Sequence, residues 1–278
     1  EEATSLAKEA DAVILIVGTN SDWETEGNDR ADFNLPANQN KLIESILDVN
    51  ENTTIVINTG SPIKMPWAKK AKAIIQTWFA GQEYGNALFD ILFGEVNPSG
   101  KLPTSFPVSI EDTPAFNCYP GKDLQMNYDE KLLVGYKWYE KKNIEPLFCF
   151  GHGLSYTNFC YENLEVIVKN NHEISCKFTI KNLGDIAGAE TAQCYVGFLD
   201  PAEEEPIKTL QGFTKIDIDA NESKDVEIKL LDRNFSYWSV DTNTWQIKKC
   251  YSTISKVSTC HSGFTWRSMC MMPALSPV

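Results

Sequence analysis

Two glutamates two residues apart, Glu24 and Glu26, lie in a strongly charged segment together with Trp23, Asp29 and Arg30. The segment follows directly after an apolar run that is typical of a buried strand. In α/β proteins, the loop beyond the carboxyl end of a strand is a common place for a ligand. A carboxyl group beside an aromatic ring and a guanidinium can be held in the protonation state that acid–base catalysis needs. These residues therefore predict acid–base chemistry, and a solvated acidic turn is the alternative.

The elements that would position this loop form a predicted α/β domain over residues 1–115. Continuous apolar runs predict strands, and apolar residues at helical spacing predict helices. The expected strands cover residues 12–17, 52–58 and 71–76, and the expected helices cover residues 2–10, 38–49 and 85–93. This order favours a partial α/β sandwich with a mostly parallel sheet. Gly94 should end the last helix in a left-handed conformation, and Gly60 and Gly100 are interpreted as turn glycines.

Beyond residue 115, the sequence pattern indicates an irregular segment followed by a second domain. Residues 116–160 form an irregular interdomain segment in which only residues 134–139 predict an added strand. Over residues 161–278, apolar and polar residues alternate between turn signals, which is typical of an antiparallel β-sandwich. The tail after about residue 246 is atypical, because it lacks Asp and Glu and holds three of the eight cysteines. We expect a shifted reading frame near Ile247 or a strongly diverged tail.

Four separated motifs share the pattern of one family. They are WETEGNDR at residues 23–30, WFAGQE at 78–83, FGEVNPSGKLP at 93–103 and FCFGHGLSYT at 148–157. Together they resemble glycoside hydrolase family 3, the β-glucosidase family, and the resemblance covers residues 1–245. Ala80 and Cys149 stand where that family usually has proline. The β-sandwich that follows resembles a fibronectin type III-like domain.

The resemblance implies a retaining glycosidase that works with two carboxyl groups. Its nucleophile is an Asp in an N-terminal (β/α)8 barrel, and its acid/base is a Glu on the α/β sandwich that follows. Matching the loop to the family pattern places the acid/base at Glu24, with Glu26 as the second candidate, and places Trp23 at the substrate. Asp29 and Arg30 are expected to pair and to structure the loop, as arginine forks do with carboxylates.

The resemblance also implies an activity for the whole enzyme. It would hydrolyse terminal, non-reducing β-D-glucosyl residues of a β-glucoside or oligosaccharide, without a cofactor. A barrel of eight βα units needs about 200 residues or more, so we expect it outside this chain and expect this chain to be inactive alone. The Glu24 loop should then be exposed. The alternative is a stand-alone remnant, or a module that binds carbohydrate or protein without catalysis.

Composition narrows the classes of partner. The formal net charge of −13 argues against nucleic acid, whose phosphates need a basic face. No apolar run reaches the roughly 18 residues of a membrane-spanning helix, so we expect no membrane partner. The eight cysteines lack metal-ligand spacing and are interpreted as scattered thiols, so we expect no metal. Secreted and cytoplasmic locations both stay open, because we do not expect Glu1 to be the native N-terminus.

Overall fold

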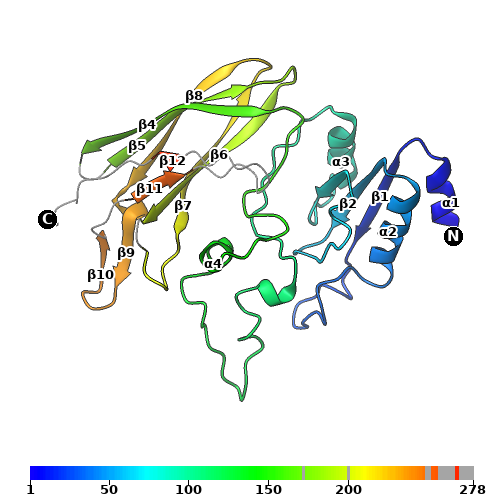
Figure 1. The fold of residues 1–278 in the computed structure, drawn as a ribbon, viewed down its shortest axis with the longest axis horizontal. Helices are drawn as coiled ribbons and strands as arrows, with labels where there is room; N and C mark the ends of the chain where they lie inside the picture. Colours follow the sequence, from blue (N-terminus) through cyan, green and yellow to red (C-terminus); the bar gives the residue numbers. More distant parts are fainter. Residues whose placement is uncertain (171–172, 199–200, 248–251, 256–266, 269–278) are drawn as a thin grey trace. The chain divides into compact units, whose positions relative to one another are not determined.

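The computed structural model describes residues 1–170, 173–198, 201–247, 252–255 and 267–268. They fall into two compact units (Figure 1). The first unit contains residues 1–88 and 106–112, and the second contains residues 89–105 and those from 113 onward. In the described part of the chain, no helix is both long and apolar enough to cross a membrane.

A three-stranded parallel sheet forms the centre of the first unit, with the strand order β1-β2-β3 (Figure 1). Its strands are β1 (Val13–Gly18), β2 (Thr53–Asn58) and β3 (Ala73–Gln76). The central strand is buried, because Ile55, Val56 and Ile57 have no exposed surface. A strand covered on both faces reads as a continuous apolar run, which is why the sequence reveals it. The expected mostly parallel sheet is confirmed.

Helices complete this α/β arrangement. The first unit contains α1 (Glu2–Glu9), α2 (Gln39–Val49) and a short 3-10 helix, η1 (Ile110–Asp112). Helix α3 (Tyr84–Phe93) begins in the first unit and ends in the second. One face of α2 buries Ile43, Ile46 and Leu47, which recur at helical spacing. Helix α3 ends at Gly94, whose φ of +81° is left-handed as predicted. The apolar periodicity therefore located each of the three α-helices to within two residues.

The second unit contains an antiparallel β-sandwich, as the alternating pattern predicts. One sheet has the order β4-β5-β8 and the other the order β12-β11-β6-β7. The strands are β4 (Phe159–Asn170), β5 (Glu173–Asn182), β6 (Gly188–Phe198), β7 (Lys208–Ile218), β8 (Ser223–Leu231), β11 (Ser252–Ser255) and β12 (Arg267–Ser268). A 3-10 helix, η2 (Asp232–Phe235), leads into a hairpin of β9 (Ser236–Ser239) and β10 (Thr244–Ile247). Beyond residue 247, only the backbones of β11 and β12 are described, so the expected frame shift near Ile247 falls mainly outside the described residues.

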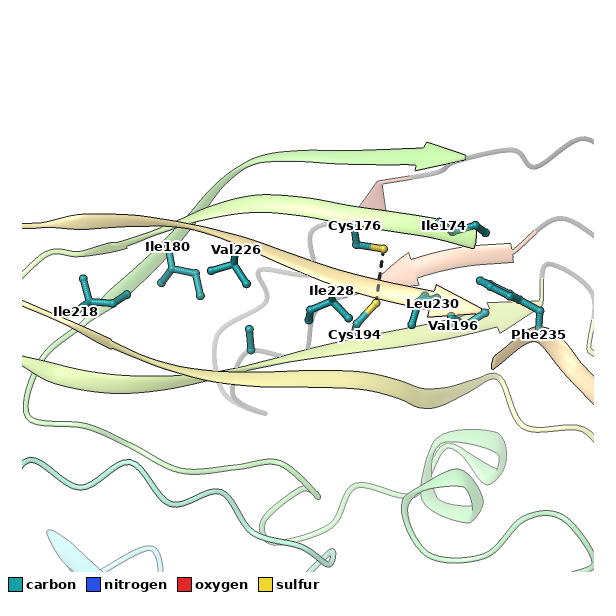
Figure 2. Packing of buried hydrophobic residues seen from close by; sticks show 11 residues of the cluster. Ile174, Cys176, Ile180, Cys194, Val196, Ile218, Val226, Ile228, Leu230 and Phe235 are labelled. Atoms are coloured by element: carbon teal, nitrogen blue, oxygen red, sulfur yellow. Dashed lines mark hydrogen bonds between the residues drawn. The ribbon is translucent and has the colours of Figure 1, made fainter. Parts of the chain in front are cut away.

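Inward-facing apolar side chains from strands of both sheets form the core of the sandwich (Figure 2). The buried cluster consists of Ile174, Cys176, Ile180, Ala192, Cys194, Val196, Ile218, Val226, Ile228, Leu230 and Phe235. Phe235 comes from η2, and the other residues alternate along their strands with outward-facing ones, as period-two patterning requires. The core therefore depends on the register of β5, β6 and β8.

Two cysteines meet inside this core. The Cys194 thiol donates to the sulfur of Cys176 over 4.0 Å, and both are free thiols (Figure 2). This hydrogen bond, together with burial, raises the pKa of Cys194. Cys118 and Cys160 are also free, whereas Cys149 is disulfide-bonded. The prediction of scattered thiols is therefore wrong for Cys149, because the connectivity of a disulfide cannot be deduced from the sequence alone.

Two of the sequence motifs are hydrogen-bonded to each other within the second unit, and one of them is also bonded to the start of the β-sandwich. The N–H of Leu102 donates to the carbonyl of His152 over 2.8 Å. The side-chain oxygen of Asn97 accepts a hydrogen bond of 2.9 Å from the N–H of Tyr156, and its side-chain nitrogen donates to the carbonyl of Ala187 over 3.1 Å. The motifs at 93–103 and 148–157 therefore have a structural role here, since they hydrogen-bond to each other and to the residue before β6.

The sequence predicts a strand over residues 134–139, and that prediction is wrong. The segment enters the helix α4 (Tyr136–Lys142), which begins after Gly135 with a φ of +60° and ends at Asn143 in the left-handed region. Tyr136 and Tyr139 are three residues apart and share one helical face, of which Tyr139 is buried. A run this short satisfies strand and helix periodicity equally well, so packing decided between them.

Candidate acid–base site

The charged loop begins where β1 ends, at the carboxyl edge of the parallel sheet. The N–H of Thr19 still donates to the carbonyl of Asn58 over 3.1 Å, so its backbone continues the pairing with β2. The chain then turns at Asn20, whose carbonyl accepts the N–H groups of Trp23 and Glu24 at 3.0 and 2.9 Å. This turn directs Glu24 back towards the end of β1.

Two groups contact the same oxygen of the Glu24 carboxylate. The hydroxyl of Thr19 donates to Oε1 over 2.8 Å, and a guanidinium nitrogen of Arg30 lies 3.7 Å from Oε1. The Glu24 side chain is only 16% exposed. The expectation that this loop is exposed is therefore wrong for Glu24, because the turn at Asn20 packs its carboxyl against the first unit's own residues.

The other carboxylate oxygen faces the connection between β2 and β3. A Cβ atom on Gly60 would lie 2.5 Å from Glu24 Oε2 and 2.7 Å from a ring carbon of Phe79. Cβ atoms are essentially never found at such distances, so a side chain at this position would require the end of the Glu24 side chain or the Phe79 ring to move. Gly60 lacks a positive φ, so its role here is the space it leaves rather than an unusual backbone conformation.

Arg30 links the end of the loop to the same connection. Its guanidinium donates to the carbonyl of Pro62 over 3.4 Å, in addition to facing Glu24, and its side chain is 21% exposed. The structure thus brings Arg30 to Glu24. Asp29 is exposed, and its expected pairing with Arg30 stays a prediction.

Glu26, the second candidate, lies on a different surface of the loop. Residues Thr25 and Asn28 form an isolated antiparallel bridge, and Gly27 between them has a φ of +82°. Glu26 therefore sits at the tip of a tight turn, where it is exposed. The structure separates the two glutamates into one shielded and one solvated carboxylate.

Trp23 is half-buried beside Glu24 in the chain. Its indole N–H is shielded from solvent and has no hydrogen-bond partner among the described residues. The side-chain oxygens of Asn58 and Gln76, the last residues of β2 and β3, are in the same condition. Buried polar atoms without partners are uncommon, and each calls for a physical explanation. All three lie at or just beyond the strand ends, where α/β sheets bind ligands.

Sequence patterns alone missed part of this site. Thr19 and Phe79 carry no signal of their own in the sequence. Gly60 has the pattern of a turn residue, and Asn58 and Gln76 look like ordinary strand ends. Their position relative to the predicted strands could have identified them, because each lies at or just beyond the carboxyl end of a strand. Among the described residues, no group of three or more His, Cys, Asp or Glu side chains could hold a metal ion.

Two family models match the chain. The Glycosyl hydrolase family 3 C-terminal domain matches residues 1–156, and the Fibronectin type III-like domain matches residues 190–255. Among curated proteins, the probable β-glucosidase I of Emericella nidulans is 42% identical over 257 residues, which cover 89% of this chain and 30% of that protein. The thermostable β-glucosidase B of Acetivibrio thermocellus is 41% identical over 250 residues, which cover 89% of this chain and 33% of that protein.

Solved structures agree with these matches. The β-glucosidase of Kluyveromyces marxianus in complex with glucose has a TM-score of 0.89 at 35% identity, covering 96% of this chain and 33% of that one. The β-glucosidase of Bifidobacterium adolescentis has a TM-score of 0.90 at 34% identity, covering 96% of this chain and 40% of that one. The chain therefore spans about a third of the length of these relatives.

Proposed function

This chain belongs to glycoside hydrolase family 3, and from that premise we propose that the protein containing it is a retaining β-glucosidase. Its substrates are β-glucosides or oligosaccharides with a terminal, non-reducing β-D-glucosyl residue. The four relatives described above are each named as β-glucosidases, which supports this substrate class. The activity belongs to the whole protein, since the chain spans about a third of those relatives.

We assign the acid/base role to Glu24. In the first step, its carboxyl protonates the glycosidic oxygen while a second carboxylate attacks the anomeric carbon, and the alcohol leaves. In the second step, the Glu24 carboxylate takes a proton from water, and that water hydrolyses the glycosyl-enzyme. Trp23, which precedes Glu24 and has a buried N–H without a partner among the described residues, is assigned to the substrate side of the site.

The observation that carries this assignment is the contrast between the two glutamates. Glu24 is 16% exposed and is held by Thr19 and Arg30, whereas Glu26 is exposed at a turn tip. An acid/base must keep its carboxyl in one position relative to the reacting oxygen. A shielded carboxyl with a fixed hydrogen bond meets that requirement, and a solvated one does not.

The nucleophile is assigned to an Asp of a (β/α)8 barrel domain outside residues 1–278, as the family resemblance implies. Residues 1–278 alone should therefore be inactive, because losing one member of a catalytic pair removes most of the rate. A barrel domain that packs on this chain is accordingly the expected partner. No cofactor is required by the mechanism.

The test compares Glu24→Gln with Glu26→Gln in the complete protein. With aryl β-glucosides that have poor leaving groups, Glu24→Gln should lower kcat/KM by about 10²–10⁴-fold, which is the usual contribution of general acid–base catalysis. With 2,4-dinitrophenyl β-glucoside, the leaving group needs no proton, so the first step should be nearly normal. Azide should then restore turnover of Glu24→Gln and yield β-glucosyl azide, because azide needs no general base.

The matched variant decides the assignment. Glu26→Gln should keep activity on both substrates within about threefold, as expected of an exposed side chain. A leaving-group-dependent loss with azide rescue in Glu26→Gln instead would move the role to Glu26. If the complete protein proves to have no barrel and no glucosidase activity, the proposal gives way to a non-catalytic remnant or a binding module.

A further inference from the structure

The two oxygens of the Glu24 carboxyl have different surroundings. Oε1 accepts the hydroxyl hydrogen of Thr19 over 2.8 Å and lies 3.7 Å from the Arg30 guanidinium. Oε2 receives no hydrogen bond from the described residues and lies against Gly60, where a Cβ would come within 2.5 Å. A proton shared between such unequal oxygens settles on the one that faces neither a donor nor a cation.

Thr19 is well placed to hold this asymmetry. Its own N–H is bound to the carbonyl of Asn58 over 3.1 Å, so the sheet fixes its backbone. Its hydroxyl can therefore reach Oε1 without ordering a flexible segment, and little entropy is lost when the hydrogen bond forms. The hydroxyl is the only polar group of the Thr19 side chain, so its function can be removed without changing the shape of the residue.

Gly60 provides the other side of this arrangement. With no Cβ, it leaves the space that Oε2 occupies, and the Phe79 ring closes the same space from a distance of 2.7 Å to the Cβ position. A methyl group there would displace the end of the Glu24 side chain, which is more flexible than the backbone. Gly60 therefore determines where the carboxyl lies, while Thr19 determines which of its oxygens is free.

We propose that Thr19 and Gly60 are positioning residues for acid–base catalysis, and that the transferable proton of Glu24 resides on Oε2. This inference rests on the proposed role of Glu24. In the first step, the O–H bond at Oε2 breaks as the glycosidic oxygen takes the proton, and the C–O bond breaks as the nucleophile's carboxylate bonds to the anomeric carbon. In the second step, Oε2 recovers a proton from the attacking water, so protons and electrons balance over the cycle.

The experiment uses Thr19→Val, Thr19→Ser and Gly60→Ala in the complete enzyme. Thr19→Val keeps the shape but removes the donor, and it should lower kcat/KM about three- to tenfold on aryl glucosides with poor leaving groups. Its effect on 2,4-dinitrophenyl β-glucoside should stay within about twofold, since that substrate needs no acid. Thr19→Ser keeps the donor and should restore the rate on poor leaving groups.

Gly60→Ala tests the same arrangement from the connection between β2 and β3, without changing Thr19. A displaced carboxyl misses the leaving oxygen, and misplacement by about 1 Å can cost up to about 10²-fold. The loss should again be confined to substrates that need the acid. Thermal melting of each variant shows whether it is folded, and Gly60→Ala carries the test if Thr19→Val is not.

The outcomes separate this inference from the proposed function. If Glu24→Gln shows azide rescue but Thr19→Val and Gly60→Ala lose nothing on poor leaving groups, the inference is overturned and the function stands. Equal losses on all substrates, or a failure of Thr19→Ser to restore the rate, would make these residues structural and also overturn it. If Glu24→Gln loses no activity, the proposed role of Glu24 fails and the inference fails with it.

Discussion

Replacing Glu190 with Gln should reveal how the second unit is held together. The Lys101 ammonium lies 3.1 Å from one carboxylate oxygen of Glu190 and donates to the carbonyl of Gly153 over 2.8 Å. The other carboxylate oxygen accepts the Tyr161 hydroxyl over 2.7 Å. Burial, followed by the neighbouring Glu190, raises the pKa of Tyr161, so this hydroxyl stays a donor at neutral pH.

The magnitude follows from how deeply the ion pair is buried. The side chains of Lys101 and Glu190 are 17% and 12% exposed. Exposed pairs contribute about 0–1 kcal/mol, whereas removing one partner of a buried pair costs about 3–5 kcal/mol, because a buried charge is left alone. This pair lies nearer the buried limit, so we expect Glu190→Gln to cost about 2–4 kcal/mol.

A double-mutant cycle measures the interaction energy between Lys101 and Glu190 separately from the effect of each single substitution. Lys101→Met removes the cation and keeps the apolar stem, and Lys101→Met/Glu190→Gln removes both charges. The double variant should lose less stability than the sum of the two single variants, because neither charge is then left unpaired. Native-state hydrogen exchange of the β6 amides is the assay, since it reports the stability of the second unit without requiring one two-state transition for the whole chain.

Two results would contradict this reasoning. Single variants that each cost less than about 1 kcal/mol would mean that the pair behaves as a solvated surface pair. Additive losses in the double variant would mean that Lys101 and Glu190 act independently. Either result would mean that the Lys101–Glu190 ion pair does not hold the 93–103 motif to β6.

Two further predictions concern the sandwich. The Ser175 hydroxyl, followed by the Lys169 ammonium, holds the pKa of Glu227 at about 2, below the ordinary 4.5. Because this pKa is depressed on folding, the stabilisation should be present above about pH 4.5 and lost as pH falls towards 2, so urea midpoints of the native protein and Glu227→Gln should converge at low pH. Gly212→Ala would place a Cβ 2.6 Å from Cγ2 of Ile228. Overpacking of this kind should lower the free energy of unfolding by about 1–3 kcal/mol. Hydrogen exchange of the β7 amides measures this loss, and an unchanged exchange rate would contradict the clash.

Several elements were predictable because they obey a local rule. Strand β2 is a continuous apolar run since both its faces are covered, and α2 shows its buried face at helical spacing. Gly94 ends α3 because the left-handed conformation there costs glycine little. The alternation in the sandwich strands follows from the geometry of a sheet with one buried face.

Other features depended on contacts that local rules do not contain. Helix α4 satisfied a strand pattern equally well over its short length, and burial of Tyr139 decided the outcome. Cys149 is disulfide-bonded, and the contact of Cys194 with Cys176 joins positions 18 residues apart in the chain. Because a pairing between distant residues imposes no spacing, the sequence held no signal for them.

The same division applies to the candidate site. The sequence by itself determined the family, the α/β and β-sandwich layout, and the loop that carries Glu24, because motif order and periodicity are properties of the chain. Only the tertiary structure decided that Glu24 is shielded while Glu26 is solvated, and that Thr19 and Gly60 surround its carboxyl. The physical reason is that the environment of a carboxyl comes from β1 and from the connection between β2 and β3, which only the folded sheet brings together.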